Sequence, residues 1–88
     1  MNLKYSFEIV DIGNEIVAVP IEDSAVKMHA VLKFNRTGRE VFALMQEPTT
    51  EEAIVNTLAE KYPNQLESMT TYVHTFVQHF RDWGLIEE

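Results

Sequence analysis

Hydrophobic and polar residues alternate through the first twenty positions of the chain in a pattern that predicts a β-hairpin. Tyr5–Ile12 and Glu15–Val19 are both rich in β-branched and aromatic residues, and only Gly13-Asn14 separates them. Gly and Asn tolerate the positive φ angles of a two-residue turn, so the two runs are expected to pair as antiparallel strands. Pro20 has no amide hydrogen to contribute to a sheet, so the second strand is expected to end or bulge there.

A third strand is predicted at Met28–Phe34, after the polar loop Glu22–Ser24. Successive side chains of a strand point to opposite faces, so the even-numbered residues from Ala30 to Phe34 should share one face. The odd-numbered residues, including Lys33, should share the other. With the hairpin, this run makes a three-stranded antiparallel sheet.

In the rest of the chain hydrophobic residues recur at spacings of three and four, which predicts helices. Asn35 is the expected cap of the first helix, and Thr49-x-x-Glu52 is expected to form a capping box before the second. Gly84 stands where a glycine commonly ends a helix, and Leu85-Ile86 is expected to fold back onto the core. Three helices are predicted, at Arg36–Gln46, Thr50–Tyr62 and Leu66–Trp83.

These elements predict a single α+β domain over residues 1–88: a three-stranded antiparallel β-meander followed by a three-helix bundle. The same order of elements is found in winged helix-turn-helix domains. A chain of 88 residues buries a modest core, for which a hydrophobic fraction of 45% is sufficient.

Charge and composition exclude several classes of protein. The 14 acidic and 7 basic residues give a net charge of −7, which opposes binding to phosphate backbones, so no nucleic-acid partner is expected. The absence of cysteine excludes disulfides and thiolate metal sites. No apolar run has the length of a membrane span or the form of a signal peptide, so we expect a cytoplasmic protein without a membrane partner.

No pattern typical of a catalytic centre occurs in the chain. There is no glycine-rich phosphate loop and no nucleophile elbow. His74 and His79 are five residues apart, which places them on different faces of a helix rather than in the i, i+4 arrangement of a zinc-binding helix. The sequence therefore predicts a protein that is not an enzyme and has no catalytic residue, cofactor or metal.

The last predicted helix has more apolar surface than a core requires. One stripe is expected to face the core, and a second stripe, spaced at i, i+4, i+7 and i+11, overlaps it. The second stripe either lines a groove or borders the core with its polar atoms in water. The core stripe comprises Leu66, Met69, Val73, Phe76, Phe80 and Trp83, and the second comprises Tyr72, Phe76, His79 and Trp83.

Both faces of the predicted hairpin are also apolar. Phe7 and Ile9 share one face of the first strand, whereas Val10 and Ile12 share the other. Antiparallel sheets with one face in water normally alternate cleanly between apolar and polar residues. A partner or a second copy of the chain is therefore expected to cover the face opposite the helices, which predicts a homodimer through the sheet.

The spacing of these residues resembles the PqqD family, the pyrroloquinoline-quinone synthesis protein D homologues, also described as RiPP precursor-peptide recognition elements. The resemblance extends over nearly the whole chain and includes Thr49/Thr50, Ile54 and Leu58. Its other parts are the run Leu32-x-Phe34-Asn35-x-Thr37-Gly38-x-x-Val41-Phe42-x-Leu44-Met45 and the later residues Phe76, Phe80 and Gly84-Leu85-Ile86. The sequence departs from the family at Phe34, where leucine is usual, and at Gln46-Glu47-Pro48, where an Asp-Gly pair is usual.

The resemblance implies a peptide chaperone or adaptor without catalysis of its own. Family members bind the leader of a ribosomally made precursor peptide as a strand beside the third strand, against the third helix. They present it to a modifying enzyme, often a radical-SAM protein. An unpaired strand edge offers main-chain groups to such a guest. The peptide-binding residues expected from this resemblance are Ala30, Val31, Leu32 and Lys33 for backbone pairing, and Tyr72, Phe76 and His79 for the cleft.

The alternative is a transcription regulator of the winged helix-turn-helix type, or another protein-interaction module. Its recognition helix would be Leu66–Trp83, which carries only Arg81 as a basic residue beside Glu67 and Asp82. Such a helix is poorly suited to neutralise phosphates, so the peptide adaptor is the preferred hypothesis.

Overall fold

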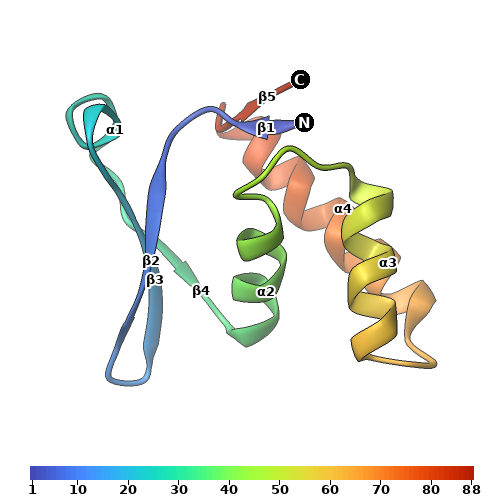
Figure 1. Cartoon of the computed structure of the whole chain (residues 1–88). Helices are drawn as coiled ribbons and strands as arrows, with labels where there is room; N and C mark the ends of the chain where they lie inside the picture. Colours follow the sequence, from blue (N-terminus) through green and yellow to red (C-terminus); the bar gives the residue numbers. More distant parts are fainter.

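The computed structural model describes all residues, 1–88, and contains two small sheets and four helices (Figure 1). The hairpin lies on one side of the molecule and the longer helices lie on the other (Figure 1). No helix combines the length and the apolar character needed to cross a membrane. In chain order the elements are β1 (Asn2–Leu3), β2 (Phe7–Ile12), β3 (Glu15–Pro20), α1 (Asp23–Lys27), β4 (Leu32–Phe34), α2 (Arg36–Leu44), α3 (Glu51–Lys61), α4 (Leu66–Asp82) and β5 (Ile86–Glu87).

The main sheet has the strand order β2-β3-β4, and both pairs are antiparallel, which confirms the predicted three-stranded meander. Gly13 takes a φ of +59° in the turn of the hairpin, as the sequence predicts. Ala18 lies opposite Ile9 on one side and opposite Leu32 on the other. Because β3 is central, β4 is left as an edge strand.

The prediction of a strand over Met28–Phe34 is wrong in its first half. Only Leu32–Phe34 pair with β3, and Ala30 and Val31 lie outside the strand. Continuing the register by two residues would place Ala30 opposite Pro20. Proline has no amide hydrogen to donate across the ladder, so pairing stops before this point.

The helix α1 was not predicted, and it makes four helices rather than three. Its five residues are too few to show a helical period, and none of its side chains is buried. Two contacts of Ser24 hold this short helix: its hydroxyl accepts from the Ser6 amide at 2.9 Å, and its carbonyl accepts from the Met28 amide, at the end of the helix, at 2.8 Å. The helix connects β3 to β4 where the sequence suggests a loop.

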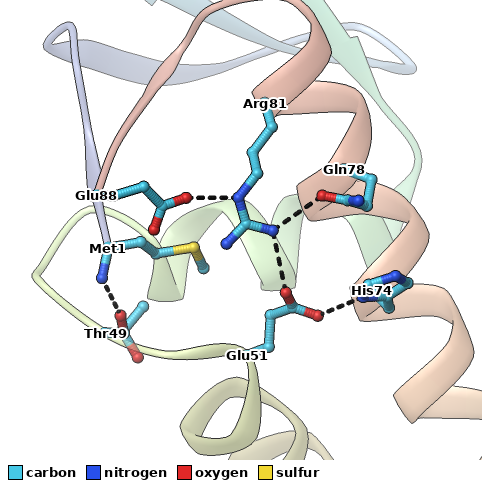
Figure 2. Close-up of polar contacts among 7 residues, drawn as sticks. All are labelled: Met1, Thr49, Glu51, His74, Gln78, Arg81 and Glu88. Carbon is cyan, nitrogen blue, oxygen red and sulfur yellow. Dashed lines mark hydrogen bonds and ion pairs between the residues drawn. The ribbon is translucent and has the colours of Figure 1, made fainter.

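The cap of α2 is confirmed, but that of α3 is shifted by one residue. The Asn35 side-chain oxygen accepts from the Gly38 amide at 2.7 Å. At α3 the Thr50 hydroxyl accepts from the Ala53 amide at 3.1 Å, so the predicted capping box at Thr49 is wrong. The Thr49 backbone is instead paired with the first residue of the chain, whose amino group donates to the Thr49 carbonyl at 2.7 Å (Figure 2).

The core lies between the sheet and the helices, and Phe42 of α2 is at its centre. Phe42 is fully buried, with its ring 5.4 Å from that of Phe7 in β2 and 5.6 Å from that of Phe80 in α4. The two ends of the predicted core stripe on α4 differ from the prediction, because Leu66 and Trp83 are 56% and 60% exposed.

The two ends of the chain form a second, two-stranded sheet, β1 with β5. Both termini consequently lie on the same side of the molecule (Figure 1). The Lys4 amide donates to the Leu85 carbonyl at 2.8 Å, and Leu85 is buried. The predicted return of Leu85 onto the core is confirmed, whereas the pairing with β1 was not predicted.

Arg81 on α4 connects this end of the chain to α3 (Figure 2). Its guanidinium donates to Glu88 at 2.5 Å, to Gln78 at 2.9 Å and to Glu51 at 3.2 Å. The other Glu51 oxygen lies 2.9 Å from Nδ1 of His74. Arg81 holds the pKa of the Glu88 carboxyl below its usual range.

A second polar cluster joins α2 to α3, and its pH dependence can be predicted. Glu40 accepts from the Tyr62 hydroxyl at 2.7 Å and pairs with the Lys61 ammonium. The hydrogen bond from Lys61, followed by that from Tyr62, holds the pKa of Glu40 below its ordinary value of 4.5. A carboxyl whose pKa is lower in the folded state stabilises the protein at higher pH, and this contribution is lost as the pH falls through the folded-state pKa.

We therefore expect Glu40→Gln to be less stable than the wild type at pH 6, with the difference shrinking once the pH falls below 4.5. Urea unfolding followed by far-UV circular dichroism across this pH range would measure it. Glu60→Gln is the matched control, because Glu60 is an exposed α3 carboxylate outside the ion pairs. Equal pH profiles for the two variants would contradict the expectation.

Candidate functional site

A groove lined mainly by hydrophobic residues lies between β4 and α4 and has a volume of about 360 Å³. β4 forms one side of it, and the second half of α4 forms the other. Six of its eight lining residues are hydrophobic. They are Val31, Leu32, Lys33, Phe34, Phe76, His79, Phe80 and Trp83.

Aromatic rings form most of this groove. The Phe76 ring lies 5.8 Å from that of Phe34 across the groove and 4.9 Å from that of Phe80 on the same helix. Phe80 is 2% exposed and belongs to the core, whereas Trp83 is 60% exposed. The Trp83 ring stacks on His79 at 5.9 Å. The groove therefore has a buried aromatic floor and an indole at its open rim.

The hydrogen-bond pattern of the sheet determines which backbone groups of β4 face the free edge. The Ile21 amide donates to the Ser6 carbonyl at 3.0 Å, and such bonded pairs recur at every second position of an antiparallel ladder. By this alternation Val17 directs its backbone groups toward β2. Lys33, which lies opposite Val17 in β4, therefore directs its amide and carbonyl away from the sheet, along the groove.

The neighbours of Lys33 are oriented differently. The same alternation directs the backbone groups of Leu32 and Phe34 toward β3, and their side chains point toward the helices. The Lys33 side chain points to the opposite face of the sheet, where its ammonium lies 3.7 Å from Glu15. The edge of β4 thus combines free main-chain groups with an aromatic groove.

The structure brings together five of the seven residues expected to form a site. Val31, Leu32, Lys33, Phe76 and His79 all line the groove.

Ala30 and Tyr72 lie outside the groove. Ala30 is exposed beyond the end of β4. Tyr72 packs one turn away on α4, and its hydroxyl donates to the Asn35 side chain at 3.2 Å. A methyl group built on Gly38 would lie 3.4 Å from the Tyr72 hydroxyl and 3.3 Å from the Phe76 ring, so this close contact requires a small residue.

Phe34, Phe80 and Trp83 line the groove although they were not among the expected site residues. The sequence pattern predicts Phe80 as a core residue, and in the structure it belongs to both the core and the groove floor. Trp83 did carry a signal, because it belongs to the second stripe of α4 that favours a groove. Phe34 is a position where the sequence departs from the family pattern, and its ring forms the β4 wall.

The lining of the groove contains few side chains that can ionise or react. Its only titratable side chains are Lys33 and His79, and none of its lining residues is a carboxylate, thiol or hydroxyl. An aromatic floor and unpaired backbone groups favour an extended, partly apolar chain as the occupant.

The sheet face opposite the helices is less exposed than the sequence suggests. Val17 at its centre is 4% exposed, and Val10 and Val19 are half-buried. Only Ile12, which is 60% exposed, presents a large apolar side chain from this face of the hairpin. The homodimer through this face stays a prediction.

Comparisons with known proteins give a family from one source and a shared fold from another. A family model described as coenzyme PQQ synthesis protein D (PqqD) matches residues 15–86. A solved structure described as TbiB1 in complex with the TbiA(beta) leader peptide has a TM-score of 0.71 at 16% identity, covering 99% of this chain and 95% of that one. Among curated proteins, none matches this sequence. The structural likeness establishes the shared fold, and the likeness to winged helix-turn-helix domains stays a prediction.

Proposed function

Since this chain belongs to the PqqD family, we propose that it binds the leader segment of a ribosomally made precursor peptide and presents it to a modifying enzyme. The leader adds as a strand to the free edge of β4 and places alternate side chains in the groove against α4. The protein itself performs no chemistry, and the enzyme it serves, of the radical-SAM class or another, acts on the rest of the precursor.

The observation that carries this proposal is the position of the Lys33 main chain. Its amide and carbonyl face away from β3, at the edge that borders the aromatic groove. A strand added there would lie about 4.8 Å from β4, and every second side chain would point toward Phe76, Phe80 and Trp83. The related fold of TbiB1 in complex with a leader peptide supports this use of the fold.

Strand addition together with a few apolar pockets predicts moderate affinity. Main-chain bonds supply part of the affinity, and pockets for alternate side chains supply the specificity. We expect a dissociation constant of about 1 µM or lower for the cognate leader, which corresponds to roughly 8 kcal/mol. The natural candidates are precursor peptides encoded beside this gene, and the exposed indole of Trp83 provides a fluorescence signal for titration.

Amide hydrogen exchange tests the binding mode residue by residue. Adding a leader peptide should slow exchange of the Lys33 amide strongly, because the guest would accept a hydrogen bond from it. The Leu32 and Phe34 amides already point toward β3, so they should change much less. The measurement is exchange followed by NMR, with and without saturating peptide.

Two outcomes would contradict the proposal. If the peptide slows amide exchange at another surface and leaves the Lys33 amide unchanged, the guest is not a strand added to β4. Failure of the neighbouring precursor leaders to bind at concentrations well above micromolar would remove the adaptor role. A peptide carrying the same residues in scrambled order is the control for nonspecific apolar binding.

A further inference from the structure

The basic residues of this acidic chain are concentrated around β4. Between Asp23 and Glu40 there is no acidic residue, although the chain has 14 of them. The same interval contains four of the seven lysines and arginines of the chain, namely Lys27, Lys33, Arg36 and Arg39. The strand that borders the groove therefore lies in a cationic segment of a molecule whose net charge is −7.

Lys33 is the member of this segment that lies on the binding edge itself. Its side chain is 71% exposed, and its only ionic partner, Glu15, is 60% exposed and 3.7 Å away. Such a pair in water contributes little to stability, so a second carboxylate can compete for the ammonium at low cost. Arg36 follows two residues after β4 and takes part in none of the ion pairs.

We propose that the peptide bound by this protein is an acidic amphipathic strand: large apolar side chains alternate with carboxylates, and the carboxylates lie beside Lys33. The proposal rests on the strand addition to β4 proposed above. In an added strand the residues facing α4 meet Phe76 and Trp83, and those between them lie on the Lys33 face. Directly opposed side chains of neighbouring strands come within about 5 Å, close enough for an ion pair.

Charge also selects the position of such a strand on the molecule. The rest of the chain carries all 14 acidic side chains, one of which, Glu15, lies beside Lys33, and it has only three lysines or arginines. An acidic peptide is therefore repelled by most of the remaining surface. At physiological ionic strength this effect extends only about 8 Å, so it acts at the groove itself. The aromatic floor supplies affinity, and Lys33 selects the charge of the guest.

The preference for acidic amphipathic peptides can be tested without a known ligand, by selection from a library of random 12-residue peptides displayed on phage. Wild-type protein should enrich peptides in which Asp or Glu alternates with Leu, Ile, Phe, Tyr or Trp. Lys33→Glu should lose this acidic preference and enrich Lys or Arg at the alternate positions instead. Equal melting temperatures of the two proteins would establish that both are folded, as expected for a side chain that is 71% exposed.

A second measurement uses one enriched acidic peptide and a matched pair of variants. Glu15→Gln removes the resident partner of Lys33 and should tighten binding about threefold, within the range of cross-strand charge pairs. Asp11→Asn removes the same charge from the same hairpin, but its partner is Arg39 on α2, at 3.3 Å, away from the edge of β4. Asp11→Asn should therefore change the affinity much less than Glu15→Gln.

The outcomes separate this inference from the proposed function. Enriched peptides that protect the Lys33 amide but show no acidic bias would overturn the charge preference and leave strand addition intact. Equal effects of Glu15→Gln and Asp11→Asn would also overturn it, because net charge alone would then explain the affinity. A library that yields no peptide protecting Lys33 would overturn both proposals.

Discussion

Replacing Phe42 by alanine is expected to destabilise the domain by about 3–5 kcal/mol, the usual range for a fully buried phenylalanine. The ring has no exposed surface and lies within 5.6 Å, centroid to centroid, of the rings of Phe7, Phe34 and Phe80. It therefore joins β2, β4 and α4. Small domains have a total stability of about 5–15 kcal/mol, so this substitution should remove a large fraction of it.

Urea unfolding followed by far-UV circular dichroism measures this loss. Leu66→Ala is the matched control, because Leu66 is 56% exposed on α4 and should change stability by less than about 1 kcal/mol. A loss below about 2 kcal/mol for Phe42→Ala would mean that the site collapses around the cavity. The packing of β4 against α2 would then contribute less than its ring contacts indicate.

Replacing Trp83 by alanine is expected to weaken leader binding about 30-fold or more, which corresponds to about 2 kcal/mol, while changing stability much less than Phe42→Ala does. Its indole lies at the rim of the groove, 5.8 Å from the Phe80 ring and 5.9 Å from the His79 ring. Because 60% of the side chain is exposed in the free protein, a bound peptide can still bury much of its apolar surface. That burial would add to the binding free energy.

Fluorescence anisotropy of a labelled peptide measures this effect, since the variant has no tryptophan of its own. Leu66→Ala serves again as the control, because Leu66 is similarly exposed at the other end of α4, outside the groove. Equal losses of affinity in the two variants would indicate binding to apolar surface in general. No loss in Trp83→Ala would place the guest away from the second half of α4.

The three longer helices and the hairpin could be predicted because local features of the sequence determine them. The Gly13-Asn14 turn, the Asn35 cap and the Gly84 helix end each depend on the conformation or hydrogen bonding of one or two adjacent residues. Such features are present in a short window of sequence. The second stripe of α4 was also visible locally, and three of its four residues line the groove.

The features that were predicted wrongly or missed depend on contacts between residues that are distant in sequence. Thr50 rather than Thr49 caps α3, and the Thr49 backbone pairs instead with Met1, 48 residues away. The pairing of β1 with β5 joins the two ends of the chain and has no local signal. The alternation of residues around Ala30 predicts a strand, but the residue opposite it, which limits the strand, is Pro20 on a different segment.

The candidate site was less predictable than the fold because several side chains serve two purposes. Phe80 is buried, and Phe34 contacts Phe42 with its ring centroid at 4.9 Å, so both have the pattern of core residues. Only the packing of β4 beside α4 shows that both also line the groove. Tyr72 had the pattern of a groove residue, but its hydroxyl is engaged by Asn35.

The proline that shortens β4 also bears on solubility. Long, flat edge strands invite identical chains to pair edge to edge, and natural proteins prevent this by keeping their edges short and charged. With three residues and an outward lysine side chain, β4 offers too little edge for two copies to assemble into an extended sheet. By limiting β4 to three residues, Pro20 should therefore also disfavour edge-to-edge aggregation.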